Sequence, residues 1–296
     1  MKKNPEYNVT IETTLLPFLL ICLKGKSRNY IKGILKRGQV MVDGVMCKDY
    51  ARSLHPEQRV EVLPKVPITN GKLGIPIIFE DDDIIVIDKP AGMLSIGTDS
   101  ERDNTAYHMV SSYIKSGTSK SGRIFIVHRL DRETSGVLLF AKNERTKYTL
   151  QDNWNTAAIK RGYVAVVEGK VLTPEGTVKS WLKQTKTLMV YSSGKKDDGK
   201  LAITNYRTLQ VGDEHSILDI SLDTGRKNQI RVHMKDLGHP VVGDKKYGAL
   251  TDPFGRIGLH ASTLTVKHPS TGEKMTFESS IPNAFTQALS LKNNTP

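Results

Sequence analysis

The segment Ile126–Gly136, IVHRLDRETSG, carries two arginines, two carboxylates, a histidine and two hydroxyl groups between two apolar runs. These runs, Ile124–Val127 and Val137–Ala141, predict two buried strands. The charged residues then form a loop on a rigid scaffold, which is a common way to present functional groups. Asp131, with an arginine close to it on each side, is the candidate for chemistry, because a carboxylate can act as a nucleophile or as a base.

Other interpretations of this loop have to be weighed. Asp131 can simply pair with an arginine and close a turn, which is the usual role of an isolated Asp–Arg cluster. The order His, Arg, Asp also occurs in the catalytic loop of protein kinases, but the Gly-rich nucleotide loop and the D-F-G sequence of a kinase are absent. A hydrolase that uses Asp131 with His128 is a further alternative, although no partner nucleophile can be identified.

The composition favours a polyanionic partner. The 296 residues include 43 Lys and Arg against 31 Asp and Glu, a net charge of +12. Such an excess is typical of nucleic-acid-binding proteins, although a soluble protein can also be basic without one. The two cysteines, Cys22 and Cys47, predict a reducing cytoplasm and argue against a cysteine metal site, and the eight histidines are scattered. No apolar run is long enough to span a membrane.

Half of the excess positive charge lies in residues 1–66, and Thr13–Val42 contains no acidic residue. Ser27 is a suitable helix N-cap and Gly38 a suitable stop, with apolar residues at helical spacing between them. Three basic residues on this predicted helix recur at every fourth position and line one face, and a fourth follows directly: Arg28, Lys32, Lys36 and Arg37. A basic face is often only solvated, but the lack of interleaved acids favours a surface that binds phosphates.

The chain is predicted to contain two domains. Residues 10–66 form a small α+β unit, in which the helix packs on a hairpin at Asp43-Gly44, and residues 67–74 form a linker. Residues 75–292 are predicted to form an α+β domain with a mixed, mostly antiparallel β-sheet. Further strands are expected at Ile75–Phe79, Ile84–Ile87, Tyr163–Val167, Ile217–Leu222, Ile230–Met234 and Leu264–Val266, helices at Thr105–Ser116 and Asn143–Trp154, and a hairpin end at Lys195–Lys200.

Five segments, in order along the chain, resemble the motifs of RluA-type pseudouridine synthases. They are IIFEDDDIIVIDKPAGMLS, HRLDRETSG, KRGYVAVVEGKV, DTGRKNQIRVHMKDLGHPVVGDKKYG and GLHASTLTVKHPSTGE, spread from Ile75 to Glu273. In front of them, SRNYIKGILKRGQVMVDG resembles the core of an S4-type RNA-binding domain, which often precedes that catalytic domain. The resemblance implies the pseudouridine synthase fold and an enzyme that isomerises uridines in structured RNA without a cofactor or a metal ion.

The resemblance also implies roles for single residues. Asp131 becomes the catalytic carboxylate, Arg231 its cationic partner, and Tyr163 the residue that stacks on the uracil ring. The alternation in Gln229–Met234 predicts a strand that turns Arg231 to its polar face. Arg129 is the candidate for filling the gap left by a flipped base or for holding a phosphate, and a salt bridge inside the loop is the equal alternative.

The resemblance also bears on Lys245 and Asn228, and on the expected substrate. Lys245, followed by Lys246, is a phosphate contact or only an exposed charge, and no catalytic role is expected for Asn228, where the family often has histidine. The alternative function is a non-catalytic RNA-binding or ribosome-assembly factor, which would not need the three implied catalytic residues together. The expected substrate is large-subunit ribosomal RNA, with transfer RNA second, and the expected protein is a cytoplasmic monomer.

Overall fold

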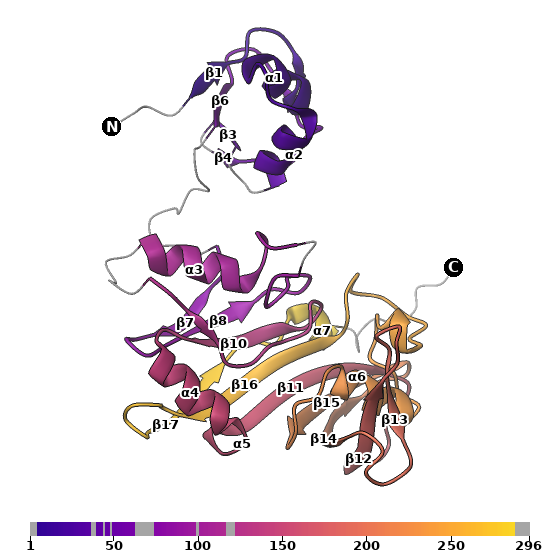
Figure 1. Cartoon of the computed structure of the whole chain (residues 1–296). Coiled ribbons are helices and arrows are strands. Elements are labelled where there is room, and N and C mark those ends of the chain that lie inside the picture. Colours follow the sequence, from indigo (N-terminus) through magenta and orange to yellow (C-terminus); the bar gives the residue numbers. More distant parts are fainter. Residues whose placement is uncertain are drawn as a thin grey trace. The chain divides into compact units, whose positions relative to one another are not determined.

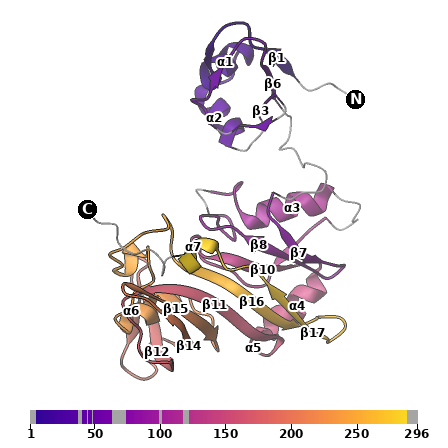
Figure 2. The same ribbon diagram turned by 180° about the vertical axis from the view of Figure 1, so that it is seen from behind.

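The structure, a computed structural model, describes residues 5–36, 40–43, 45–47, 49–62, 74–98, 101–116 and 122–287. The chain divides into two compact units, residues 1–72 and residues 73–296 (Figures 1 and 2). Each unit encloses its own apolar core. Within the described ranges, no helix is long and apolar enough to cross a membrane.

The smaller unit packs two helices against a four-stranded antiparallel sheet. Its elements are β1 Glu6–Asn8, β2 Thr13–Thr14, α1 Leu15–Cys22, α2 Arg28–Lys36, β3 Val40–Val42, β4 Val45–Met46, β5 Ser53–Leu54 and β6 Arg59–Val62, with the sheet order β1-β6-β3-β4. Ile31 and Ile34 of α2 are buried in its core. The Ser27 hydroxyl accepts a hydrogen bond from the Tyr30 amide at 3.1 Å, which confirms the predicted N-cap. The predicted hairpin is confirmed by the pairing of β3 with β4, although Gly44 itself lies outside the described residues.

The predicted basic face lies on α2. Arg28 and Lys32 are exposed, and the Lys32 ammonium lies 5.3 Å from the centre of the Tyr50 ring. Lys36 is the last residue of α2, but its side chain is outside the described part of the structure, and so is the whole of Arg37. For the two described side chains, the prediction of a solvent-facing basic surface is confirmed.

The larger unit is built on an eleven-stranded sheet. Its main path runs β13-β12-β14-β15-β11-β16-β10-β8-β7, with β17 beside β16 and β9 beside β10 (Figure 1). The strands are β7 Ile77–Glu80, β8 Ile84–Lys89, β9 Phe125–Ile126, β10 Ser135–Ala141, β11 Ala158–Glu168, β12 Glu175–Gln184, β13 Val190–Ser193, β14 Lys200–Val211, β15 His215–Leu222, β16 Leu259–Lys267 and β17 Lys274–Glu278. The helices are α3 Ala106–Ser116, α4 Glu144–Asp152, α5 Trp154–Ala157, α6 Gln229–Asp236, α7 Asn283–Gln287 and a 3₁₀ helix, η1, Lys245–Tyr247.

The pairing in this sheet confirms the predicted mixed, mostly antiparallel α+β fold. Every pair in it is antiparallel except β10 with β16. On β8, Ile85 and Ile87 pack with α3, whereas Ile84 and Val86 pack with α4 on the opposite face. All residues of β10 are buried, because the sheet is covered on both faces here. The charged loop before β10 therefore starts from a rigid base.

One predicted strand is a helix. Gln229–Asp236 forms α6, so the expectation of a strand at Ile230–Met234 is wrong. Ile230 and Met234 pack in one apolar cluster and Val232 in another, so α6 is buried on two sides. An alternating run of six residues fits a short helix buried on two sides as well as a half-buried strand, and the sequence pattern alone does not separate them.

Two other differences concern the far end of the sheet. Lys195–Lys200 is not a hairpin end, because β13 and β14 both pair with β12 and lie on either side of it. The sequence gives no clear signal for β12, whose residues are mostly exposed or half-buried. A strand with so little buried apolar surface has a weak hydrophobic pattern.

Gly136 is where the charged loop enters the sheet. It has a φ of +111° and pairs with Ala261 at the parallel contact of β10 with β16. A Cβ atom at this position would lie 2.1 Å from the Ala261 carbonyl oxygen. Only glycine allows this backbone conformation and this approach of the two strands.

We expect the Gly136→Ala variant to lose more than about 2 kcal/mol of unfolding free energy, because both strands must move apart. The matched control is Gly238→Ala, since Gly238 also has a positive φ, +81°, but open space around its missing Cβ. The control should lose about 1 kcal/mol. Urea unfolding followed by tryptophan fluorescence reports on the larger unit, which contains both tryptophans. Equal losses in the two variants would contradict the close-contact argument.

Candidate active site

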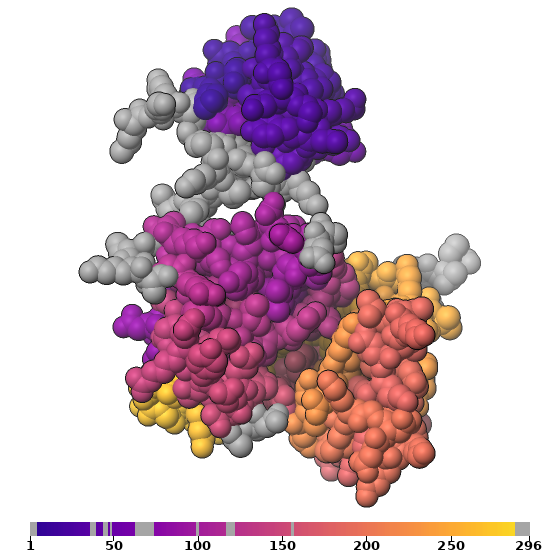
Figure 3. Space-filling view, viewed as in Figure 1, coloured from indigo at the N-terminus to yellow at the C-terminus, as the bar shows by residue number. Residues whose placement is uncertain are grey.

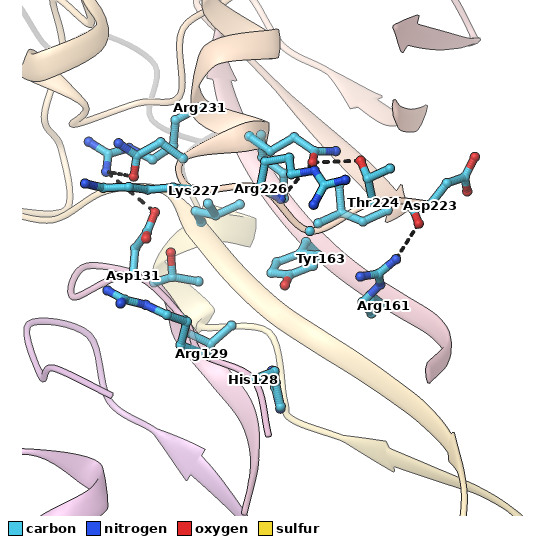
Figure 4. Close-up of a pocket in the computed structure, with 18 of the residues that line it drawn as sticks. His128, Arg129, Asp131, Arg161, Tyr163, Asp223, Thr224, Arg226, Lys227 and Arg231 are labelled. Carbon is cyan, nitrogen blue, oxygen red and sulfur yellow. Dashed lines mark hydrogen bonds and ion pairs between the residues drawn. The ribbon is translucent and has the colours of Figure 1, made fainter. Parts of the chain in front are cut away.

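A cavity of about 490 Å³ opens in the larger unit beside the charged loop. It is lined by residues 127–131, Thr134, Trp154, Arg161, Tyr163, residues 222–231 and Leu259. Figure 3 shows the hollow between the magenta and orange parts of the larger unit, and Figure 4 shows its lining. The charged loop, strand β11 and the segment that leads into α6 thus meet in one place.

The backbone of the loop that carries Asp131 is held by hydrogen bonds to two buried polar side chains, Ser95 and Lys89. Ser95 is buried, accepts a hydrogen bond from the Leu130 amide at 3.0 Å and donates one to the Leu130 carbonyl at 2.7 Å. Lys89 is completely buried, and its ammonium donates to the carbonyls of Pro90, Met93 and Arg132. Burial lowers the pKa of Lys89 to about 8, so it carries its three protons at neutral pH. These bonds fix the backbone on both sides of Asp131.

His128 is a structural residue of the cavity wall. Its Nε2 accepts a hydrogen bond from the Leu139 amide at 3.0 Å, and its ring stacks on Trp154 with 4.7 Å between centres. Burial, and then the charge of Arg161, lowers the pKa of His128 to about 3. A neutral imidazole whose acceptor nitrogen is already bonded cannot serve as a base beside Asp131, which argues against the hydrolase alternative.

Asp131 lies next to a buried arginine from α6. The Arg231 Nη1 atom is 3.7 Å from the Asp131 Oδ2 atom (Figure 4). Arg231 also donates from Nε and Nη2 to both carboxylate oxygens of Asp244, at 2.6 and 2.8 Å, and its guanidinium lies 4.9 Å from the Tyr247 ring centre. Burial alone would lower the pKa of Arg231, but the bonds and charge of Asp244, with smaller contributions from Asp131 and Tyr247, raise it. Arg231 is therefore a fixed cation.

Asn228 orients this arginine. It is buried, precedes α6 and has a left-handed backbone with a φ of +54°, which asparagine tolerates better than most residues. Its side-chain oxygen accepts a hydrogen bond from Arg231 Nη1 at 3.2 Å, and its amide donates to the Tyr247 hydroxyl at 2.9 Å. These contacts need an amide with a donor and an acceptor and no proton transfer.

Tyr163 projects from β11 into the same cavity, between Asp131 and Arg161 (Figure 4). Burial raises its pKa to about 12; the nearby Arg161 lowers it and Asp131 raises it. The side chain is therefore a neutral phenol at neutral pH, and it lines the cavity.

The two RNA-binding residues predicted in the larger unit, Arg129 and Lys245, both have exposed side chains. Arg129 is exposed at the cavity and forms no ion pair with another described residue, so the alternative of a salt bridge inside the loop finds no support. Arg132 pairs instead with Glu101 at 2.9 Å. Lys245 lies in η1 with its side chain 80% exposed, 3.6 Å from Asp252.

Three residues around this cavity were not predicted from the sequence: Lys89, Arg161 and Asp244. Asp244 could have been sought, because a buried arginine such as Arg231 needs a carboxylate partner. Its position 13 residues further along the chain follows no local spacing rule. Lys89 and Arg161 resemble ordinary surface cations in the sequence, and only the fold buries them.

Comparison with known proteins identifies the family. Residues 83–236 match the family model for RNA pseudouridylate synthase. Ribosomal large subunit pseudouridine synthase D of Pseudomonas aeruginosa is 32% identical over 289 residues, which cover 90% of this chain and 87% of that protein. YlyB of Bacillus subtilis, an uncharacterized RNA pseudouridine synthase, is 33% identical over 273 residues, which cover 89% and 88%.

Solved structures agree in fold. Human RNA pseudouridylate synthase domain containing 1 superposes with a TM-score of 0.59 at 25% identity and covers 75% of this chain and 89% of that chain. Human RNA pseudouridylate synthase domain containing 4 shares the fold, with a TM-score of 0.60 at 21% identity over 73% and 92%. The chain belongs to the RNA pseudouridine synthase family and is an isomerase that acts on RNA.

We expect Asp244→Asn to lower both stability and activity. The Asp244 side chain is fully buried, and its loss of charge leaves Arg231 as a buried cation with one distant anionic neighbour. Breaking such a buried pair costs about 3–5 kcal/mol. The matched control is Asp219→Asn, which removes a pair with the exposed Arg207 and should cost no more than about 1 kcal/mol. Thermal unfolding of both variants checks this, and a loss of the same size in the control would contradict it.

A pH dependence follows from His233, a fully buried histidine of α6 that pairs with the Thr204 and Ser180 hydroxyls. Burial, opposed by Asp236, lowers its pKa from the ordinary 6.5 to about 4. Between about pH 4 and pH 6.5, His233 therefore binds a proton more readily in the unfolded protein than in the folded protein, and this favours unfolding. Stability is therefore present above about pH 6.5 and falls by about 2–3 kcal/mol as the pH drops to about 4.

The test compares melting temperatures of the wild type and the His233→Gln variant between pH 7 and pH 4. We expect the variant to lose less stability over this range than the wild type. His108→Gln, a change at an exposed histidine, should follow the wild type. Parallel curves for all three proteins would show that His233 does not contribute.

Proposed function

We propose that this enzyme converts specific uridines of large-subunit ribosomal RNA into pseudouridine, with Asp131 as the essential carboxylate. The observation that carries the proposal is the pairing of Asp131 with the fixed cation Arg231 at 3.7 Å in a cavity that also holds Tyr163. The Pseudomonas aeruginosa relative is by name a synthase of the large ribosomal subunit, which supports ribosomal over transfer RNA.

The chemistry suits this arrangement. The bond between N1 of uracil and C1′ of ribose breaks, the base turns, C5 bonds to C1′, and the C5 hydrogen leaves while N1 gains one. Asp131 acts as a nucleophile or as a base at the sugar, with the cation Arg231 beside it. Tyr163 offers an aromatic face on which the uracil ring stacks. No oxidant or reductant is needed.

The target uridine lies in folded RNA and has to be flipped into the cavity at a cost of about a few kcal/mol. Arg129, exposed at the cavity and without an ion pair among the described residues, fills the gap or holds a phosphate. Lys245, with its exposed side chain, adds a phosphate contact. These positive charges reduce the cost of opening the RNA by binding its backbone.

The smaller unit contributes RNA affinity as an S4-type domain. The exposed side chains of Arg28 and Lys32 on α2 belong to its phosphate-binding face, and Lys36 and Arg37 extend it in sequence. Lys32 beside the exposed Tyr50 ring places a cation next to a surface on which a base can stack. The enzyme works as a monomer in the cytoplasm in this proposal.

We expect Asp131→Asn to lower activity by more than about 1,000-fold while RNA binding remains. The measurement maps pseudouridines in total RNA of cells without the gene, complemented by the wild type, by Asp131→Asn or by Asp213→Asn, which changes a surface aspartate with a side chain 96% exposed. Carbodiimide labelling and reverse-transcription stops locate the sites. One or a few large-subunit sites should vanish on deletion and return with the wild type and Asp213→Asn only. If no site in any RNA changes, the proposed activity is contradicted.

A further inference from the structure

Arg161 is a buried cation in the cavity that the proposed chemistry does not use. It lies on β11 two residues before Tyr163, so both side chains point from the same face of the strand. Arg161 is only 8% exposed, lines the cavity and lies on the side of Tyr163 away from Asp131 (Figure 4). The order along the cavity is therefore carboxylate, aromatic ring, guanidinium.

The bonding of Arg161 is incomplete. Its Nη2 donates to the Asp223 backbone carbonyl at 2.6 Å, whereas its Nε is buried and has no hydrogen-bond partner. Arg161 forms no ion pair with a carboxylate of the described residues, unlike the buried Arg231, which has Asp244. A guanidinium has five donors and no acceptor, and burying it with so few partners is costly. The Nη1 group is not buried and forms no hydrogen bond with a described residue, so a ligand oxygen in the cavity can accept a hydrogen bond from it.

The surroundings of Arg161 keep this guanidinium in place. A Cβ atom on Gly225 would lie 3.0 Å from Arg161 Nη1, so a larger residue here would push the guanidinium group aside by a few tenths of an ångström. The Gln229 side-chain oxygen accepts hydrogen bonds from the Thr224 hydroxyl at 2.9 Å and from the Arg226 amide at 3.0 Å, which fixes the segment around Gly225. Arg161 therefore presents its donors from a fixed position.

On the basis of the function proposed above, we infer that Arg161 donates a hydrogen bond to the C4 carbonyl oxygen of the target uracil and so selects uridine over cytidine. The ribose of the target must lie at Asp131, and the base stacks on Tyr163. The edge of the base remote from the ribose then points along the cavity toward Arg161. Uracil has a carbonyl oxygen at C4, whereas cytosine has an amino donor that a donor-only guanidinium cannot bind.

Such a contact makes Arg161 a specificity-determining residue. A site built to hydrogen-bond one substrate group rejects an analogue without it strongly, because the buried polar groups of the site are then unpaired. Loss of one hydrogen bond from a charged donor corresponds to a decrease of about 10- to 100-fold in kcat/KM.

The first test measures tritium release from RNA of the deletion strain labelled at C5 of uracil, because formation of the C5–C1′ bond expels this hydrogen. The full-length Arg161→Gln variant should lose about 10- to 100-fold in kcat/KM. Gly225→Ala, which leaves Arg161 in the chain but crowds its Nη1, should change kcat/KM in the same direction. Arg207→Gln, at an arginine that pairs with Asp219 outside the cavity, is the matched control and should match the wild type.

The second test identifies the atom that Arg161 binds. It uses a transcript of the mapped site with 4-thiouridine as the target, because sulfur is the weaker acceptor. The wild type should be less active on the 4-thiouridine RNA than on the uridine RNA. The Arg161→Gln variant should be about equally active on the two RNAs, because it has already lost the contact with this atom. If both proteins lose equally, and a methylphosphonate at a neighbouring phosphate instead removes their difference, Arg161 binds phosphate and the inference is wrong.

The outcomes separate this inference from the proposed function. An active wild type with an equally active Arg161→Gln variant overturns the role of Arg161 alone. A wild type that releases no tritium contradicts the isomerisation itself, and the inference fails with it. Circular dichroism and thermal unfolding of Arg161→Gln and Gly225→Ala establish that any loss arises in folded protein.

Discussion

The cavity depends on how the charge of Arg231 is shared between two carboxylates. Asp244 is fully buried and holds two of the five guanidinium donors at 2.6 and 2.8 Å, while Asp131 lies at 3.7 Å and is 25% exposed. The short pair fixes the arginine and offsets the cost of burying it. The long pair places a positive charge beside Asp131 without holding that carboxylate in a tight bidentate bond. One side of the arginine is bonded to the buried Asp244, and the other side faces the cavity beside Asp131.

The two partners reach this geometry through separate supports. Arg231 is placed by α6, where Asn228 lies three residues before it and bonds to the same guanidinium. Asp131 is placed by a backbone clamped at Leu130 and Arg132 by Ser95 and Lys89. The two residues are held by different segments of the chain. The Asp131–Arg231 distance therefore depends on how these segments pack together in the larger unit. This is why the buried Lys89, and Gly136, where a Cβ atom would clash with Ala261, matter for a site that neither of them enters.

Much of this could be read from the sequence, and the exceptions have physical reasons. The apolar runs Ile84–Ile87 and Val137–Ala141 predicted β8 and β10 because both strands are buried on both faces, whereas the run before the charged loop forms only the two-residue, half-buried β9. The loop motif pointed to Asp131 because so many charged groups between buried strands are unusual. The strand predicted at Ile230–Met234 failed because two-sided burial of a short helix gives the same alternation. Arg161 and Asp244 were missed because their burial comes from distant segments, which no local pattern encodes.

The single parallel contact of the sheet has a consequence for the order in which the molecule assembles. It joins Ser135 to His260, 125 residues apart in the chain, and it closes the base of the charged loop. The apolar core of the smaller unit is made of residues between Val9 and Val62, so it can fold early during synthesis, whereas the cavity must wait for β16. A nascent chain therefore acquires the basic surface of α2 well before the cavity, because the cavity needs contacts between residues that are far apart in the sequence.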